Sequence, residues 1–415
     1  MEGTLKKFLF LVVIVTVAFF AAACGADEQV EAPTPEIAAE TADPAVPEGI
    51  GNGRYRGIYG DGGEQQVSIQ FDVADGVFTN VSFRHLQYRG NSYRNLPEDH
   101  QSYPVFAQHL QIAEYLEGRP ITDAVDLYNP GNFISDIDGY SGATIRGSKV
   151  HSAIQDGLNR GIYSPRNGYT TNLESFPDGR YRGIYGDGGE QQVSIQFDVT
   201  NNTFSNVSFR HLQYRGDSYR NLPEDHQSYP VFAQHLQIAE HLNGQPLTAV
   251  FDLHSPADFV DDIDGYSGAT VRANKVFSAI RDGLNRGLYS PTNGIDREIG
   301  SYADGRYRGI YGDGGEQQVS IQFDVTNNTF SNVSFRHLQY RGNSFRNLPE
   351  DHQSYPVFAQ HLQIAEHLNG QPLTAVFDLH SPADFVDDID GYSGATVRAN
   401  KVFSAIRDGL NRGLY

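Results

Sequence analysis

Residues 54–73 read RYRGIYGDGGEQQVSIQFDV, and the same stretch returns unchanged at 180–199 and 306–325. Outward from it, one 110-residue unit occurs three times, at 54–163, 180–289 and 306–415, with a constant step of 126 residues. Each unit is long enough to bury a core of its own. The pattern therefore predicts three tandem copies of a small domain and excludes a single large catalytic domain.

The first third of each unit predicts an antiparallel sheet. In the first unit, apolar and polar residues alternate from Val67 to Val73, which is typical of strands with one face in water. Turns rich in Asp and Gly, at 60–63 and 74–76, separate the strands. A third strand reaches about Leu86.

Two helices are expected to follow the sheet. Pro104 suits a first helical turn, and Gly118 suits a helix end. Apolar residues recur between them at helical spacing: Phe106, Leu110, Ala113 and Leu116. A second helix is predicted from about Ile145 to Arg160, before Gly161. The fold class is thus α+β, with an antiparallel sheet covered by helices in each copy.

The N-terminal 24 residues have the organisation of an export signal. Lys6 and Lys7 precede an apolar run from Phe8 to Ala23, and the only cysteine of the chain, Cys24, follows. Ala21-Ala22-Ala23-Cys24 resembles a bacterial lipobox, although the usual leucine three places before the cysteine is missing. The resemblance implies an exported lipoprotein with a lipid on Cys24; an uncleaved membrane anchor is the alternative.

Residues 25–53 are expected to form a disordered tether, because they contain seven acidic residues, four prolines and no basic residue. Two 16-residue linkers, 164–179 and 290–305, separate the repeats. A flexible chain of that length has an end-to-end distance of about 22 Å. Adjacent domains are therefore expected to touch without being locked together.

Composition excludes several classes of function. A net charge of −20 argues against nucleic-acid binding, which depends on Lys and Arg at phosphates. A single cysteine excludes intramolecular disulfides, thiolate zinc or iron–sulfur sites and c-type haem attachment. The sequence shows no Ser-His-Asp arrangement or paired carboxylates that can be assigned to catalysis, so no catalytic residues are predicted.

The second helix of each repeat is preceded by Asp-Gly-Tyr-Ser-Gly-Ala-Thr, at 138–144, 264–270 and 390–396. Small residues followed by a hydroxyl at a helix start place that hydroxyl near unpaired backbone N–H groups, where an anion is stabilised. The threonine can equally be a simple helix cap. Spacing alone leaves both interpretations open.

The segment resembles the flavinylation motif of the FMN-binding domain family, known from subunits of the sodium-pumping NADH:quinone reductase and the RNF complex and from exported multi-flavin lipoproteins. The opening of each repeat, such as Asp178-Gly179-Arg180, also resembles the family's first strand. In that family, a flavin transferase of the ApbE type joins FMN to the threonine through a phosphoester. The resemblance implies three FMN groups per chain.

Matched residue by residue, the resemblance assigns the FMN acceptors to Thr144, Thr270 and Thr396. The other motif residues implied to bind the cofactor are Asp138, Ser141, Gly142 and Ala143, Asp264, Ser267, Gly268 and Ala269, and Asp390, Ser393, Gly394 and Ala395. The adjacent Tyr140, Tyr266 and Tyr392 are candidates for stacking on the flavin ring. Many family members carry Ser or Thr two places after the acceptor, where this chain has Arg146, Arg272 and Arg398.

The resemblance implies an electron carrier rather than a self-contained turnover enzyme. It would be lipid-anchored outside the cytoplasmic membrane or on the cell envelope, would take electrons from a membrane quinol or NADH dehydrogenase and would pass them to an external acceptor. Two alternatives remain: a cell-surface repeat protein that binds glycan or a protein partner without flavin, which would profit from multivalency, and the same fold with reversibly bound FMN.

Other conspicuous residues have structural interpretations. The segment 84–89, Arg-His-Leu-Gln-Tyr-Arg, either lines a flavin or phosphate pocket or forms an exposed strand edge. His100 and His109 lack a spacing that places two ligands on one helix face, so no metal site is predicted. Residues 61–64 suit a hairpin turn better than a calcium loop.

Overall fold

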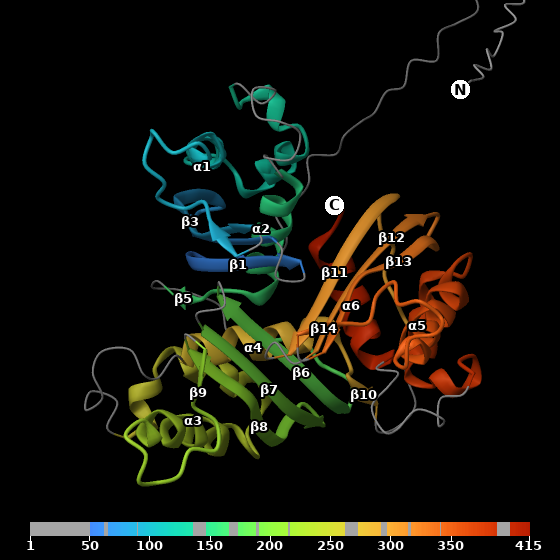
Figure 1. The fold of residues 1–415 in the computed structure, drawn as a ribbon. Coiled ribbons are helices and arrows are strands. Elements are labelled where there is room, and N and C mark those ends of the chain that lie inside the picture. The colour runs from blue at the N-terminus through green and yellow to red at the C-terminus, as the bar shows by residue number, and fades with distance from the viewer. Residues whose placement is uncertain are drawn as a thin grey trace, which may run out of the picture. The chain divides into compact units, whose positions relative to one another are not determined.

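The computed structural model describes residues 50–61, 65–88, 90–135, 147–165, 173–187, 191–214, 216–261, 273–291, 297–313, 317–340, 342–387 and 399–415. The described chain is mixed α/β and contains three antiparallel sheets. The same order of elements recurs in each of the three sequence repeats (Figure 1). Among the described residues, no helix has the length and apolar character that crossing a bilayer requires.

The first repeat shows the pattern of elements. Its elements are β1 (Gly53–Asp61), β2 (Gln65–Ala74), β3 (Val77–Tyr88), β4 (Asn91–Ser92), α1 (Tyr103–Leu116), the 3₁₀ helices η1 (Ile121–Tyr128) and η2 (Pro130–Asn132), α2 (Gly147–Arg160) and β5 (Ser164–Pro165).

The second and third repeats follow the same plan. The second has β6 (Gly179–Asp187), β7 (Gln191–Thr200), β8 (Thr203–Tyr214), β9 (Asp217–Ser218), α3 (Tyr229–Leu242), η3 (Leu247–His254), η4 (Pro256–Asp258), α4 (Ala273–Arg286) and β10 (Ser290–Pro291). The third has β11 (Gly305–Asp313), β12 (Gln317–Thr326), β13 (Thr329–Tyr340), β14 (Asn343–Ser344), α5 (Tyr355–Leu368), η5 (Leu373–His380), η6 (Pro382–Asp384) and α6 (Ala399–Arg412).

The predicted meander is confirmed. The first sheet has the order β4-β3-β2-β1-β5, and all its neighbouring strands are antiparallel. The turn between β2 and β3 contains Asp75 at φ 51° and Gly76 at φ 77°, and only a few residue types adopt this left-handed conformation readily. The Asp-Gly pair therefore terminates β2 and starts β3 as the sequence predicts.

The predicted helices are also present, and one of the apolar residues at helical spacing is exposed. Helix α1 buries a stripe that contains Val105, His109, Ile112 and Leu116, whereas Leu110 is 44% exposed. Leu110 lies one position beyond His109, about 100° further round the helix, and so faces water.

Strand β1 and helix α2 approach each other at backbone distance. A Cβ atom placed on Gly57 would lie 1.7 Å from the Ala153 carbonyl oxygen, and the facing helix residue, Gly157, is also a glycine. Gly183 and Gly309 have the same contact with Ala279 and Ala405. Helices α2, α4 and α6 can therefore lie directly on the first strand of their own sheets (Figure 1).

The cores of the three repeats are joined to one another. Ile58 of the first repeat belongs to the buried cluster of the second, Ile184 of the second to that of the third, and Ile310 of the third to that of the first. Each repeat thus inserts one isoleucine into the core of the next, and the third returns to the first.

Aromatic contacts follow the same cyclic order. The ring of Tyr163 stacks on Tyr185 of the second repeat, with ring centroids 5.9 Å apart. Tyr289 lies 6.1 Å from Tyr311 of the third repeat, and Tyr415 stacks at 5.8 Å on Tyr59 of the first. The three contacts form a closed set, since each repeat gives one ring and receives one.

The expectation that the linkers leave the domains free to separate is wrong for the described part of the chain. The first linker begins as β5, which pairs with β1. Its later residues Leu173 and Phe176 pack against the core of the second repeat. The second linker begins as β10, and its residues Ile299 and Tyr302 pack against the third core. Apolar residues within each linker make these contacts.

Strand β3 is neither a free edge nor a flavin pocket at Arg84. The guanidinium group of Arg84 lies 3.0 Å from the carboxylate of Asp187 in the second repeat. Ser68 donates a hydrogen bond to the same carboxylate at 2.8 Å, and His85 lies 3.4 Å from it. This part of the sheet is therefore an interface between repeats. Arg89 lies outside the described residues.

The close contact between β1 and α2 predicts opposite outcomes for two glycines of one strand. Gly57→Ala should lower the free energy of unfolding by at least about 2 kcal/mol, because the methyl group would overlap backbone atoms. Gly60→Ala is the matched control, since no atom lies within 4 Å of its added Cβ, and it should cost nothing. Urea denaturation measures both; equal destabilisation by the two variants would contradict the contact.

Candidate functional site

All predicted cofactor residues lie outside the described part of the chain. They fall within 136–146, 262–272 and 388–398, which include the acceptors Thr144, Thr270 and Thr396, the rest of each motif, and the tyrosines Tyr140, Tyr266 and Tyr392. The proposed lipidation residue, Cys24, also lies outside it. The structure does describe the residues that lead into and out of each motif.

A glutamine of the preceding helix forms a hydrogen bond with the last described residue before each motif. The Gln111 side-chain oxygen accepts hydrogen bonds from the backbone N–H and the hydroxyl of Ser135, at 2.9 and 3.0 Å. In the other repeats, Gln237 and Gln363 accept from the backbone N–H groups of Asp261 and Asp387, both at 2.7 Å. Helices α1, α3 and α5 therefore fix where each motif segment starts.

A buried lysine follows each motif, in the first turn of the next helix. Lys149, Lys275 and Lys401 are the only lysines of the three repeats, and each is at most 4% exposed. The ammonium groups of Lys275 and Lys401 lie 6.0 and 5.8 Å from the ring centres of Tyr185 and Tyr311. Lysine is rarely buried, because removing its charge from water is costly.

A buried histidine on the first long helix lies near this lysine. His109 donates from Nδ1 to the Val105 carbonyl oxygen at 2.7 Å, since a carbonyl can only accept. Burial, with a smaller contribution from the charge of Lys149, lowers the pKa of His109 to about 4. His235 has the same arrangement, and its pKa is also lowered to about 4. Both imidazoles are therefore neutral at neutral pH.

The flanks of each motif can thus stabilise an anion. A positive charge is buried one turn into the helix, and the helix start contributes its own partial positive charge. The neighbouring histidine is neutral and adds no further charge. This distribution suits a phosphate group better than a cation.

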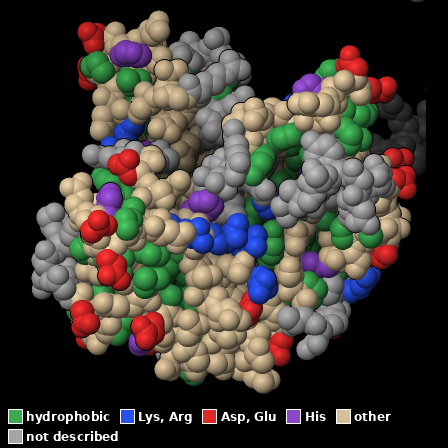
Figure 2. All heavy atoms as spheres, turned by 60° about the horizontal axis from the view of Figure 1, so that its bottom comes forward, with side chains coloured by type: hydrophobic (Ala, Val, Ile, Leu, Met, Phe, Trp, Pro, Cys, Tyr) green, Lys and Arg blue, Asp and Glu red, His purple; other side chains and the backbone are tan. Residues whose placement is uncertain are grey.

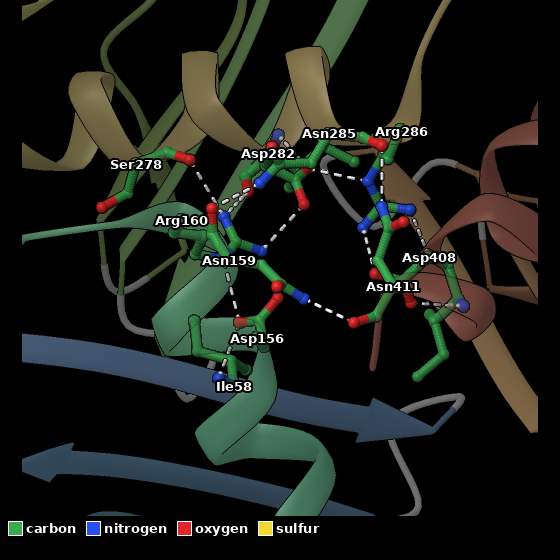
Figure 3. Close-up of polar contacts among 12 residues, drawn as sticks. Ile58, Asp156, Asn159, Arg160, Ser278, Asp282, Asn285, Arg286, Asp408 and Asn411 are labelled. Carbon is green, nitrogen blue, oxygen red and sulfur yellow. Dashed lines mark hydrogen bonds and ion pairs between the residues drawn. The ribbon is translucent and has the colours of Figure 1, made fainter. Parts of the chain in front are cut away.

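A separate group of carboxylates has the spacing of a metal site. In the part of the chain that the structure describes, ligand atoms of Asp156, Asp282 and Asp408 lie within 4.8 Å of one another, and all three residues are buried. Figure 3 shows that arginines surround them. Arg160 pairs with Asp156 at 2.8 Å on its own helix and with Asp282 at 3.1 Å on the next.

The pairing continues around all three repeats. Arg286 joins Asp282 to Asp408, and Arg412 joins Asp408 back to Asp156, at distances from 2.8 to 3.1 Å. Each carboxylate also accepts the backbone N–H of an isoleucine at 2.9 Å: Ile58, Ile184 or Ile310. We call these six side chains the arginine–aspartate cluster. The cluster joins the repeats through these ion pairs. Because its charges cancel, it provides no excess negative charge for a metal ion.

The sequence analysis missed this cluster and the buried lysines. Asp-Gly-Leu-Asn-Arg stands unchanged in all three repeats, at 156–160, 282–286 and 408–412. On one helix, Asp and Arg four residues apart are usually an exposed ion pair. Each repeat contains a single lysine, always at the same position. This pattern could have pointed to Lys149, Lys275 and Lys401.

Comparison of the chain with protein-family models, with curated proteins and with solved structures found no match. The resemblance to the FMN-binding family therefore rests on the motif and on the opening of each repeat.

The arginine–aspartate cluster predicts how stability depends on pH. Burial alone would raise the pKa of Asp156, but the charges of Arg160 and Arg412 and the Ile58 N–H hold it below its ordinary value. Because the folded-state pKa is depressed, the stabilisation is complete above the unfolded pKa of about 3.9 and is lost as the pH falls through the folded value.

We expect a nearly constant free energy of unfolding from pH 7 to 5 and a steep loss below about pH 4, measured by urea denaturation. Asp187 contributes with the same sign, because its pKa is also lowered. The triple variant Asp156→Asn, Asp282→Asn, Asp408→Asn isolates the cluster: it should be less stable at pH 7 and lose less stability on acidification. Greater stability at pH 3 than at pH 6 would contradict this assignment.

Proposed function

We propose that this chain is an exported electron-transfer flavoprotein that carries three FMN groups on Thr144, Thr270 and Thr396. The observation that carries the proposal is the threefold recurrence of Asp-Gly-Tyr-Ser-Gly-Ala-Thr, each copy leading into a helix with a buried lysine in its first turn. The lysine supplies the positive charge that a phosphoester requires.

The attachment requires a flavin transferase and FAD. The threonine hydroxyl oxygen forms a bond to the phosphorus on the FMN side of FAD, the pyrophosphate bond breaks, AMP leaves and the hydroxyl proton is released. When attached, FMN accepts or donates one or two electrons, and the protein supplies its position and electrostatic surroundings. Asp138 and Tyr140, with their counterparts, are proposed to surround the cofactor.

We further propose that a lipid on Cys24 anchors the protein outside the cytoplasmic membrane, and that the acidic segment 25–53 is a disordered tether. The donor is proposed to be a membrane quinol or NADH dehydrogenase and the acceptor an external one. The contacts between repeats support electron passage between neighbours in a fixed arrangement, rather than by collision.

The second candidate is a surface repeat protein that binds glycan or a protein partner without flavin. Three copies of one unit favour it through multivalency. Colourless protein from cells with an active transferase would support this candidate. Colour that denaturation and filtration remove would instead support reversible FMN binding.

Covalent attachment predicts a modified threonine in each repeat. After co-expression with a flavin transferase, a denatured gel band should fluoresce as flavin. Peptides with Thr144, Thr270 and Thr396 should be heavier by FMN minus one water. Each Thr→Ala variant should lose one third of the bound flavin, and the two unchanged threonines of the same chain are the controls. Unmodified threonine peptides from such cells would overturn the proposal.

The buried lysine predicts a repeat-specific effect. Lys275→Met should lower flavin incorporation at Thr270 at least threefold, because it removes the buried positive charge in the first turn of the helix that follows that motif. Thr144 and Thr396 in the same molecules are internal controls and should keep their flavin. Peptide mass spectrometry measures the three sites separately. Equal incorporation at all three sites would show that Lys275 has only a structural role.

A further inference from the structure

A cavity of about 750 Å³ opens between the three repeats, and all its lining residues are described. Its volume lies in the range of small-molecule sites. The first repeat contributes Gln155 and Leu158, the second Phe277 and Arg281, and the third Phe403 and Arg407. It is therefore a property of the assembled repeats and is absent from any one of them.

The cavity extends along the long helices to their last turns. Leu158 and Asn159 belong to the last turn of α2, and Leu284 and Asn285 to the last turn of α4. The motifs precede the first turns, and a helix of 14 residues is about 21 Å long. The last turns that line the cavity are therefore far along each helix from its first turn, which the motif precedes in the sequence.

One side of the cavity is closed by three asparagines in a cyclic arrangement (Figure 3). Asn159 donates to the Asn411 carbonyl oxygen at 2.6 Å, Asn285 to that of Asn159 at 2.6 Å, and Asn411 to that of Asn285 at 2.7 Å. These amide N–H groups are already used within the protein. The position of the cavity is consequently fixed by the same helices that carry the arginine–aspartate cluster.

The other walls are largely aromatic. Phe251 and Phe277 from the second repeat and Phe377 and Phe403 from the third line the cavity, and within each repeat their ring centroids are 5.9 Å apart. His254 and His380 also line it. Burial lowers the pKa of both to about 4, so they are uncharged at neutral pH. Aromatic walls of this kind favour a planar apolar ligand.

Two guanidinium groups supply the positive charge of the cavity. In the described structure, Arg281 and Arg407 have neither a hydrogen bond nor a carboxylate within 4 Å, and neither is among the residues with further contacts. The pKa of Arg281 is lowered by burial, and the more distant charge of Glu174 offsets part of that effect. Glu298 is the other lining carboxylate. Guanidinium groups only donate hydrogen bonds, so they select an acceptor.

Basic side chains also gather on one face of the molecule. Figure 2 shows Lys and Arg side chains gathered in the middle of one face, beside hydrophobic side chains, with most Asp and Glu side chains toward its periphery. A basic centre within an acidic protein directs anions toward it.

We propose that this cavity binds an aromatic anion, with its ring against the phenylalanine walls and its carboxylate or sulfonate on Arg281 and Arg407. The arginines are specific to two repeats, because the first carries Gln155 at the corresponding position. The site does not depend on attached flavin.

The test compares two fluorescent probes that differ in one charged group. 8-Anilinonaphthalene-1-sulfonate carries a sulfonate, and N-phenyl-1-naphthylamine is the same skeleton without it. Titration of the full chain should show tighter binding of the sulfonate. Arg281→Gln and Arg407→Gln, which introduce the residue that the first repeat already has, should each weaken its binding about tenfold and leave the uncharged probe unchanged.

Two controls separate the cavity from general effects. Gln155→Arg adds a third guanidinium group to the wall and should strengthen sulfonate binding. Arg119→Gln removes an equal charge from the surface and should have no effect, since Arg119 is exposed, pairs with Asp123 and does not line the cavity. Equal affinity for both probes, or no response to Arg281→Gln and Arg407→Gln in folded protein, would overturn the proposal.

Discussion

The arrangement of the three repeats depends on one buried interaction, the neutral cluster of three aspartates and three arginines. Each guanidinium group joins a carboxylate of its own repeat to one of the next. Removing a single partner from such a cluster typically costs about 3–5 kcal/mol, because an opposite charge is left buried. The same arginines also donate to backbone carbonyls of the following repeat, including that of Ile184 from Arg160. Separation of the repeats would therefore break ion pairs and hydrogen bonds to the backbone at the same time.

Within one repeat, the sequence was enough to predict the elements. Alternation located β2, an Asp-Gly pair located the turn before β3, and Pro104 and Gly161 located helix boundaries. These signals are local, since each depends on backbone conformation or on one face of one element. The assembly could not be predicted in this way. Asp156 and Arg160 have the spacing of an exposed ion pair, and only the approach of two further helices buries them.

The candidate site also has a part that the sequence predicted and a part that it did not. Its motif was found from the sequence, through three identical segments, and the acceptor threonines stay a prediction. Lys149, Lys275 and Lys401 were missed, because a lysine beside an apolar stripe normally extends to water. Burial of all three depends on the contact between α2 and β1, where glycine permits an approach that larger residues prevent. The environment of each motif is thus set by residues far from it in sequence.

The first repeat differs from the others where the cyclic arrangement closes. Tyr128 stands where the other repeats have His254 and His380, and its hydroxyl donates to the Leu414 carbonyl oxygen of the third repeat while it accepts from His151 at 2.9 Å. The first and third repeats are not consecutive, so their contact has no short linker to hold the partners close. A hydrogen bond specific to this contact compensates for that difference. The first repeat also has Gln155 rather than arginine at the cavity wall, so the repeat that closes the array is also the one that makes its cavity asymmetric.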